Sequence, residues 1–347
     1  MILTKGKTKI MLILAFESSC DETSVAIASF DKGEKKVLAN KTATQIAIHA
    51  LYGGVVPEIA GRAHIEAISN LTYAAFDEAG VTVDDIDAVA VTSEPGLIGA
   101  LLVAVNYAKS FALAHGLPLI PVNHIRAHIA AVYYEYPDLQ APFFAMVASG
   151  GHTSLINVKS ATEFETVGRT RDDAIGEAFD KVARVMGMPY PGGAEMDRLA
   201  SVGNPKAIRF PTAAMQDSLD FSFSGLKTAV INYINTARQK GEELAVADIA
   251  ASFTAAVLHA VITNLEKAKE RYGFDTMVLA GGVAANSHLR RAVSEFCKKK
   301  QIKLCLPSLS YCGDNGAMIA AQGYFEYLAG KRADSSLNAR PTVKGAN

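Results

Sequence analysis

The segment MLILAFESSCDETSVAIASF, which begins at Met11, carries the pattern on which the architecture of this chain rests. Its apolar runs at residues 11–16 and 24–30 flank the polar residues 17–23, which predicts two buried strands joined by a polar loop. The design recurs at residues 143–158, where FFAMV and SLINV flank SGGHT. Two such hairpins predict a duplicated α/β domain, whose halves face each other across a ligand-binding cleft.

Helix-like and strand-like segments alternate along the rest of the chain, as an α/β fold requires. The predicted helices cover residues 57–79, 97–115, 173–186, 225–237, 246–271, 285–297 and 317–328. The predicted further strands cover residues 86–92, 117–122, 163–168, 276–280 and 302–306. We expect an N-terminal lobe at residues 1–120 and a C-terminal lobe at residues 121–316 with the metal and nucleotide loops. In the last segment, residues 317–347, we expect a helix that packs back on the first lobe and a disordered tail after Lys331.

The composition is that of a globular chain with room for two packed cores: 347 residues, 50% hydrophobic and 20% charged. The formal net charge of −1 gives no overall positive field, so we expect nucleic acid to be held only together with other subunits. The four cysteines show no Cys-x2-Cys spacing, which argues against a thiolate zinc site and indicates the reducing cytoplasm. The sequence contains no uninterrupted run of about twenty apolar residues, so it predicts no membrane-spanning helix.

His124 and His128 lie four residues apart at the start of a predicted helix, directly after the strand-like run at residues 117–122. Side chains with this spacing share one face of a helix, so the two imidazoles can bind one metal ion. A third candidate ligand is Asp314, which lies in a turn-forming run ahead of another apolar helix. Two imidazoles and one carboxylate suit Fe²⁺ or Zn²⁺, and we favour one Fe²⁺ ion per chain.

Three glycine-containing segments can bring backbone N–H groups against phosphate or ribose oxygens: residues 149–151, 191–193 and 281–286. The third is the clearest, because it joins a buried strand to the N-terminus of a helix. Neither Gly-x4-Gly-Lys-Ser/Thr nor Gly-x-Gly-x-x-Gly occurs, which disfavours P-loop and dinucleotide-binding folds and favours a two-lobed nucleotide clamp. Asp180 and Asp197 are candidate acceptors for ribose hydroxyl groups.

Nine ordered motifs between Met11 and Leu328 resemble those of the tRNA N6-adenosine threonylcarbamoyltransferase family (TsaD/Gcp), formerly named O-sialoglycoprotein endopeptidases. They are ESSCDET (17–23), YGGVVPE (52–58), HIRAH (124–128), SGGHT (149–153), GEAFDK (176–181), YPGG (190–193), FSFSGLK (221–227), GGVAAN (281–286) and DN (314–315). The resemblance implies an actin/Hsp70-like (ASKHA) fold with two ribonuclease-H-like lobes, which agrees with the repeated hairpin.

The resemblance also implies a site and a reaction. His124, His128 and Asp314 would bind the metal ion. The substrate, threonylcarbamoyl-AMP, would contact Val147, Ala148, Ser149, Gly150, Gly151, Asp180, Gly193, Asp197 and Asn286, and ATP or ADP would fit the same cleft. The threonylcarbamoyl group would pass to the N6 amine of the adenosine 3′ of the anticodon, in tRNAs reading codons that begin with A, with release of AMP. The implied partners are tRNA, a paralogous actin-like subunit and a small P-loop ATPase.

Three residues depart from the family pattern. Glu94 replaces the first glycine of a Gly-Pro-Gly-Leu loop, Ala127 replaces a glycine between the histidines, and Gly313 replaces a threonine beside the metal aspartate. The carboxylate of Glu94 would repel an anion in the cleft unless it points away. The metal ligands themselves are unchanged.

An aromatic amine is a poor nucleophile, and Asp21 or Glu22 in the first polar loop are the candidate acceptors for its proton. Three other functions fit part of the pattern. A metalloprotease would need a glutamate at position 125, which is Ile125. An ATP-dependent small-molecule kinase of the same fold would need no histidine pair, and a non-catalytic scaffold of a tRNA-modification complex would need neither the ligands nor the glycine loops.

Overall fold

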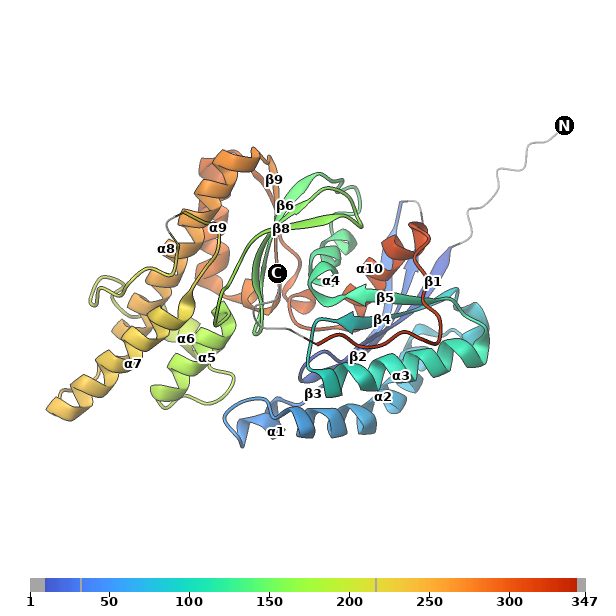
Figure 1. The fold of residues 1–347 in the computed structure, drawn as a ribbon, viewed down its shortest axis with the longest axis horizontal. Helices are drawn as coiled ribbons and strands as arrows, with labels where there is room; N and C mark the ends of the chain where they lie inside the picture. Colours follow the sequence, from blue (N-terminus) through green and yellow to red (C-terminus); the bar gives the residue numbers. More distant parts are fainter. Residues whose placement is uncertain (1–9, 32, 216, 342–347) are drawn as a thin grey trace. The chain divides into compact units, whose positions relative to one another are not determined.

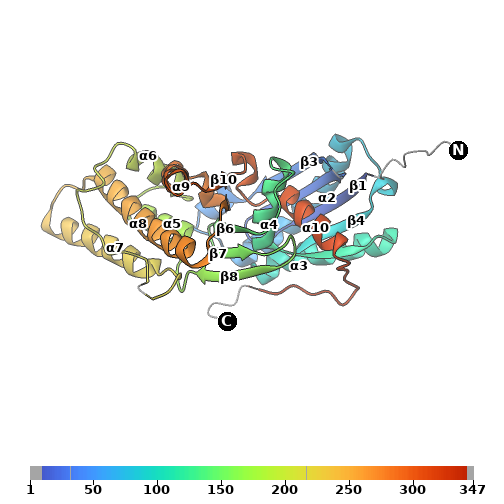
Figure 2. The same cartoon turned by 90° about the horizontal axis from the view of Figure 1, so that it is seen from above.

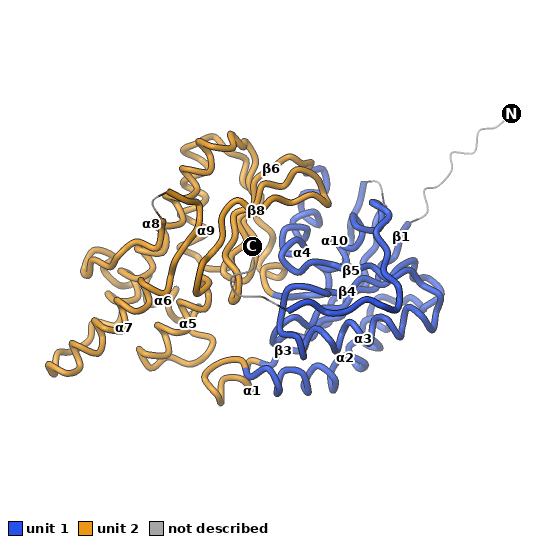
Figure 3. Tube along the Cα trace, in the orientation of Figure 1, with its two compact units in different colours: residues 1–45, 56–139, 314–342 blue, residues 46–55, 140–313, 343–347 orange. Residues whose placement is uncertain are grey.

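The computed structural model describes residues 10–31, 33–215 and 217–341, and it divides into two units, each with one five-stranded sheet (Figures 1 and 3). Unit 1 comprises residues 1–45, 56–139 and 314–342, and unit 2 comprises residues 46–55, 140–313 and 343–347.

The sheet of unit 1 has the strand order β3-β2-β1-β4-β5. Its strands are β1 (Met11–Glu17), β2 (Glu22–Phe30), β3 (Lys35–Thr44), β4 (Ala88–Glu94) and β5 (Leu119–Asn123). β1 and β2 form the predicted hairpin, with Met11 opposite Phe30 and Glu17 opposite Ser24. β4 and β5 continue the sheet in parallel with β1, so the three strands end at the same edge.

Helices cover both faces of this sheet (Figure 1). α2 (Pro57–Ala79) and α3 (Ile98–His115) lie on one face and share a core with Phe16. α10 (Gly316–Leu328) lies on the other face, where Gly323 permits a close approach: a Cβ at this position would lie 2.6 Å from the Cβ of Ala90. Successive strand residues point to opposite faces, so burial on both sides explains the continuous apolar runs.

The sheet of unit 2 repeats this topology. Its strands are β6 (Phe143–Ala148), β7 (Thr153–Val158), β8 (Phe164–Arg169), β9 (Thr276–Ala280) and β10 (Lys303–Cys305), in the order β10-β9-β6-β7-β8. Starting from β8, this is an antiparallel three-stranded meander followed by two strands parallel to β6, as in unit 1. The match confirms the predicted duplication.

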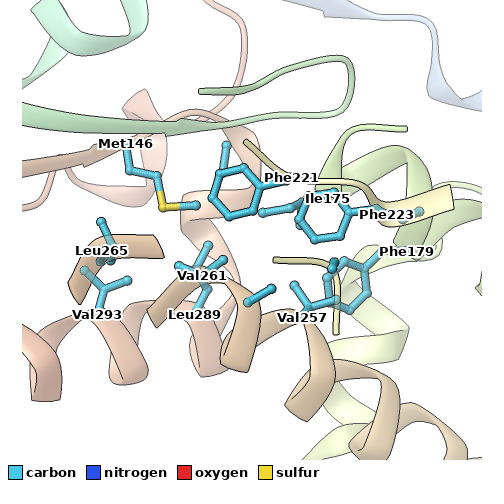
Figure 4. Close-up of a cluster of buried hydrophobic side chains, with 14 of the residues drawn as sticks. Met146, Ile175, Phe179, Phe221, Phe223, Val257, Val261, Leu265, Leu289 and Val293 are labelled. Atoms are coloured by element: carbon cyan, nitrogen blue, oxygen red, sulfur yellow. The ribbon is translucent and has the colours of Figure 1, made fainter. Parts of the chain in front are cut away.

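The helices of unit 2 pack around one apolar core (Figure 4). They are α5 (Ile175–Val185), α6 (Gly193–Ala200), α7 (Phe223–Lys240), α8 (Val246–Tyr272) and α9 (Ser287–Lys299). The short helix α1 (Ile46–Ala50) also belongs to unit 2 but contributes no residue to this core. Met146 of β6 lies in this core with Val261 of α8 and Val293 of α9. Burying a side chain of this size stabilises the fold by about 2 kcal/mol. The loops at the edge of the sheet are therefore attached to a closely packed core.

Several short elements connect the larger ones. α4 (His124–Ala130) follows β5 directly and lies beside α10 (Figure 2). The 3₁₀ turns are η1 (Val83–Asp85), η2 (Ala131–Tyr134), η3 (Gly282–Ala285) and η4 (Leu309–Tyr311).

The sequence pattern does not predict three of the described helices and strands, namely β3, the five-residue helix α1 and α6. β3 is an edge strand whose only apolar run, residues 37–39, is three residues long and is flanked by lysines and other polar residues. α6 is short and starts at Gly193, in a segment whose Pro-Gly-Gly sequence predicts a turn. The first polar loop is also shorter than predicted, because β1 extends through Glu17 and β2 begins at Glu22.

The units divide the chain at points other than the predicted lobe boundaries. Residues 121–139 belong to unit 1, because β5 pairs with β4 and α4 packs against α10. Residues 331–341, which we expected to be disordered, have defined contacts: the N–H of Ala333 donates to the carbonyl of Leu119 at 2.8 Å, and Ala339 is buried. Residues 342–347 of the expected tail lie outside the described residues.

Two helices, α3 and α8, are long and apolar enough to cross a membrane by length and composition. Both are core helices of their units. α3 buries Leu101 and Val105 in the core of unit 1, and α8 buries a row of residues from Ile249 to Ala268 in unit 2. Their hydropathy is explained by this burial.

Candidate metal centre and nucleotide-binding loops

The two histidines of the predicted metal site lie on α4, which begins at the end of β5. Asn123 caps this helix, because its side-chain oxygen accepts hydrogen bonds from the N–H groups of Ile125 and Arg126 at 3.0 and 3.2 Å. The four-residue spacing places both imidazoles on one face, with their ring centroids 4.6 Å apart. His128 is fully buried and His124 is 4% exposed.

Asp314, just ahead of α10, meets the two histidines. Its Oδ1 lies 3.2 Å from Nε2 of His128 and 3.5 Å from Nε2 of His124. The three ligand atoms all lie within 4.8 Å of one another, a spacing that one shared ion can bridge. The structure therefore brings the three predicted metal ligands together, and all three belong to unit 1.

His128 provides an independent indication of a bound group. Among the described residues, no hydrogen-bond partner exists for either of its buried ring nitrogens, since the approach of Asp314 to Nε2 lacks hydrogen-bond geometry. A buried polar group left in this state costs about 1–3 kcal/mol, which a metal bond would offset. Two imidazoles and one carboxylate are a donor set for Fe²⁺ and also for Zn²⁺. The residues therefore fit a divalent metal ion.

A fourth residue, Glu17, completes the centre and is not among the predicted site residues. Glu17 ends β1 and is fully buried. Its Oε2 lies 3.1 Å from Nδ1 of His124, the ring nitrogen that does not face Asp314. The sequence signal was a carboxylate at the end of an apolar strand, but the partner on α4 becomes visible only once the strand order is known.

The carboxylates of the centre change the ionisation of their neighbours. Burial alone would lower the pKa of His124, but Asp314 and Glu17 raise it to about 9. Burial, with the negative charges of Asp314 and Asp21, raises the pKa of Glu22 to about 10. Protonated groups at both positions indicate that the centre carries a surplus of negative charge, which a cation would neutralise.

The segment with the candidate proton acceptors Asp21 and Glu22, at the start of β2, is held in place by a buried histidine of α2. Nδ1 of His64 lies 2.7 Å from the hydroxyl of Thr23, and its Nε2 lies 3.0 Å from the carbonyl oxygen of Cys20. The contacts tie α2 to Cys20 in the loop between β1 and β2 and to Thr23 near the start of β2. The sequence did not single out His64.

Glu94, the departure that was expected to disturb an anion, has a cationic neighbour. Oε2 of Glu94 lies 3.6 Å from Nη1 of Arg340, and the N–H of Arg340 donates to the carbonyl of Ser93 at 2.8 Å. The turn after Glu94 packs closely against the loop between β1 and β2, because a Cβ at Gly96 would lie 2.6 Å from the carbonyl oxygen of Ser19. The side chain of Arg340 is 82% exposed, so this ion pair is screened by water and weak.

In unit 2, the predicted substrate segment Val147 to Gly151 follows β6 and rests on the start of α5. The carbonyl oxygens of Ser149 and Gly150 accept hydrogen bonds from the N–H groups of Gly176 and Glu177 at 3.3 and 3.1 Å. These bonds fix the loop against the start of α5 and occupy the N–H groups of Gly176 and Glu177.

The second glycine segment is fixed by a predicted site residue. The carboxylate of Asp180, on α5, accepts a hydrogen bond from the N–H of Gly192 at 2.8 Å. Gly193, which follows, is the first residue of α6. Asp180 and Gly193 are therefore brought close to each other, as predicted for one site.

The third glycine segment meets α6 through Asp197. The carboxylate of Asp197 accepts hydrogen bonds from the N–H of Ser287 at 3.0 Å and faces Nδ1 of His288 at 2.7 Å. Asn286 caps α9 by accepting from the N–H of Leu289 at 2.9 Å. Asp197 and Asn286, two of the predicted substrate residues, thus hold the start of α9.

All nine predicted substrate residues lie in unit 2, and the described hydrogen bonds link their loops into one continuous set. They are Val147, Ala148, Ser149, Gly150, Gly151, Asp180, Gly193, Asp197 and Asn286. Their contact with a nucleotide stays a prediction.

An ion-pair network beside these loops ties α5 to α7. Oxygens of Asp173 lie 2.7 and 2.6 Å from Nζ of Lys181 and Lys227, and the hydroxyl of Ser224 donates to Asp173 at 2.9 Å. Burial alone would raise the pKa of Asp173, but hydrogen bonds from Lys181, Lys227 and Ser224 lower it to about 2.

Asp173→Asn is expected to lower the free energy of unfolding at pH 7 by about 2 kcal/mol, because the ionised carboxylate is bound more tightly in the folded state. A lowered pKa stabilises the fold above the unfolded-state value of about 4, and this contribution is lost as the pH falls towards 2. Denaturant titrations at pH 7 and pH 2.5 measure the difference. The exposed Asp217→Asn is the control, and equal stability of the two variants at pH 7 would contradict the network's role.

Solved structures define the class of fold. T. kodakarensis HypF matches with a TM-score of 0.64 and 15% sequence identity, over 94% of this chain and 49% of that chain. Component A of (R)-2-hydroxyglutaryl-CoA dehydratase from Acidaminococcus fermentans matches with a TM-score of 0.53 and 14% identity, over 92% of this chain and 99% of that chain. Together with the duplicated sheets, these matches confirm the predicted actin/Hsp70-like fold.

Sequence comparison defines the family. Residues 36–321 match the family model TsaD, tRNA N6-adenosine threonylcarbamoyltransferase. Proteins of that name from Clostridium botulinum (strain 657 / Type Ba4) and Clostridioides difficile (strain 630) are 52% and 48% identical, each over 96% of this chain and 97% and 98% of their own lengths. The chain belongs to the tRNA N6-adenosine threonylcarbamoyltransferase family.

Proposed function

We propose that this chain transfers the threonylcarbamoyl group of threonylcarbamoyl-AMP to the N6 amine of the adenosine 3′ of the anticodon, in tRNAs that read codons beginning with A, and releases AMP. Family membership supports this reaction. The observation that carries the proposal is the convergence of His124, His128 and Asp314, because the rival kinase and scaffold functions need no such group.

The metal centre would hold one Fe²⁺ or Zn²⁺ ion on His124, His128 and Asp314, and this ion would polarise oxygens of the acyl-adenylate as a Lewis acid. The remaining work falls to the chain's own groups. The amides of the loop at residues 147–151 would bind the phosphate, and Asp180 and Asp197 would orient the ribose. Because the substrate is a mixed anhydride, its carbonyl is already activated, so positioning is the main task of the protein.

Asp21 and Glu22 are the two candidate acceptors for the proton of the attacking amine. Burial, with the carboxylates of Asp314 and Asp21, raises the pKa of Glu22 to about 10. A cation bound to Asp314 would offset part of this negative charge and lower the pKa of Glu22 again, so either carboxylate would be available to accept the proton.

The RNA would be bound jointly with partner subunits, a paralogous actin-like protein and a small P-loop ATPase. Support comes from the charge distribution: unit 1 has 13 Lys and Arg against 18 Asp and Glu, whereas unit 2 has 21 against 17. This modest basic surplus is too small to bind tRNA tightly at physiological salt. Four free cysteines agree with a cytoplasmic location.

The function is tested by incubating the full-length chain and its partner subunits with threonylcarbamoyl-AMP and an unmodified tRNA transcript. The expected products are AMP and a threonylcarbamoylated adenosine, which mass spectrometry of the digested tRNA detects. A parallel reaction contains ATP labelled in the γ-phosphate. Phosphoryl transfer to a small molecule without modified adenosine would favour the kinase, and no reaction in either assay would favour the scaffold.

A further inference from the structure

Glu17 has a position that the chemistry of the metal ligands alone does not require. It is the last residue of β1, its exposure is 0%, and three groups surround its carboxylate. Oε1 accepts a hydrogen bond from the N–H of Ser19 at 2.5 Å, and Oε2 accepts one from the hydroxyl of Thr92 at 2.5 Å. Oε2 also lies 3.1 Å from Nδ1 of His124.

These contacts fix the orientation of the Glu17 carboxylate, because each oxygen has its own partners. The backbone N–H of Ser19 can only donate, so Oε1 is fixed on that side. Oε2 is therefore left to face the imidazole of His124, and an ionised carboxylate can only accept a hydrogen bond there. The hydroxyl of Ser19 also lies 3.2 Å from Nδ1, but a hydroxyl can either donate or accept, so the acceptor-only carboxylate of Glu17 decides in favour of a proton on Nδ1 of the neutral ring.

The position of that proton decides what the other nitrogen can do. A neutral imidazole with its proton on Nδ1 has its lone pair on Nε2, and Nε2 is the atom that faces Asp314 at 3.5 Å. A metal-binding histidine usually donates its second N–H to a carboxylate or carbonyl, which fixes the ring and raises its basicity.

We infer that Glu17 is a positioning residue of the metal centre: it holds the proton of His124 on Nδ1, so that Nε2 is presented to the ion. The inference rests on the metal centre of the proposed function, but not on the transfer reaction. Glu17 would touch neither the ion nor the substrate, and would act only through His124.

Glu17→Gln tests the inference, because its amide has one acceptor and one donor end. The N–H of Ser19 keeps the amide oxygen on its side, so the NH₂ group would face His124 and favour the ring with its proton on Nε2. A proton on Nε2 would occupy the lone pair that has to bind an ion next to Asp314. Zn²⁺ affinity, measured by competition with a chromophoric chelator, is expected to fall by about 10- to 100-fold.

Thr92→Val is the matched control. It removes a hydrogen bond to the same carboxylate oxygen at nearly constant volume but leaves Glu17 facing His124. If Glu17 served only to anchor β1 and β4, both variants would lose thermal stability and neither would lose Zn²⁺ affinity. Under the inference, Thr92→Val keeps its Zn²⁺ affinity within about threefold of the wild type.

The wild-type protein offers a test that does not depend on the folding of any variant. In Zn²⁺-loaded protein with ¹⁵N-labelled histidine, the NMR signals of His124 are expected to show a proton on Nδ1 and the metal on Nε2. A proton on Nε2, or an unchanged Zn²⁺ affinity in a folded Glu17→Gln protein, would overturn the inference. If the wild-type protein binds no Zn²⁺ or Fe²⁺ at all, the metal centre of the proposed function fails instead.

Discussion

His128→Ala is expected to lose the bound metal ion and to lower threonylcarbamoyl transfer by at least about 100-fold. His128 supplies one of the three ligand atoms. Among the described residues, its buried ring nitrogens have no hydrogen-bond partner, so no structural hydrogen bond accounts for this side chain. Metal content by elemental analysis and modified adenosine by mass spectrometry measure the two effects. Circular dichroism establishes that the variant is folded.

Two further variants make the result interpretable. Asp314→Asn preserves the size of the side chain but removes its charge, and it should weaken metal binding in the same way. His259→Ala removes an exposed histidine of α8 and should change neither metal content nor transfer. Normal turnover by a folded, metal-free His128→Ala protein would remove the metal from the proposed reaction.

Gly281→Ala is expected to lower the thermal midpoint by roughly 5 °C or more and to weaken adenylate binding. Gly281 has φ +93°, a backbone conformation that L side chains rarely adopt, and an added Cβ would lie 2.4 Å from the carbonyl oxygen of Ala148. Neither strand can move away easily, because β6 and β9 are paired at Val147 and Ala280. The backbone strain and the steric clash both act where the predicted substrate loop at residues 281–286 meets the one at residues 147–151.

The neighbouring glycine is the control for this prediction. Gly282 lies at the start of η3, and a Cβ there would meet nothing within 4 Å. Gly282→Ala should therefore leave the melting temperature within about 1 °C of the wild type. Thermal melting followed by circular dichroism and calorimetric titration with a stable adenylate analogue compare the two variants. Equal behaviour of both would show that the close approach at Gly281 is not essential.

The main elements were predictable because their patterns are local. The apolar runs of β1 and β6 reflect burial, and the spacing of His124 and His128 reflects a helical turn. The repeated hairpin also predicted the duplication, which the equivalent strand orders of the two sheets confirm. Local pattern and the family resemblance together therefore give most of the fold and the three candidate metal ligands.

What the sequence did not reveal depends on contacts between distant segments. Glu17 meets His124 only because β1, β4 and β5 are adjacent in parallel. The pairing of Glu94 with Arg340 likewise requires that the segment after α10 follow a defined path, whereas its polar composition predicted disorder. Neither partner has a sequence spacing that local patterns can recognise.

The most direct test of the account is the dependence of transfer on metal equivalents. The full-length protein is freed of metal with a chelator, combined with its partner subunits, and titrated with Fe²⁺ or, separately, Zn²⁺ in the presence of threonylcarbamoyl-AMP and tRNA. We predict that transfer is absent without added ion and reaches a plateau at about one equivalent per chain, as expected for a single three-ligand site. Full transfer by the metal-free protein would contradict the account.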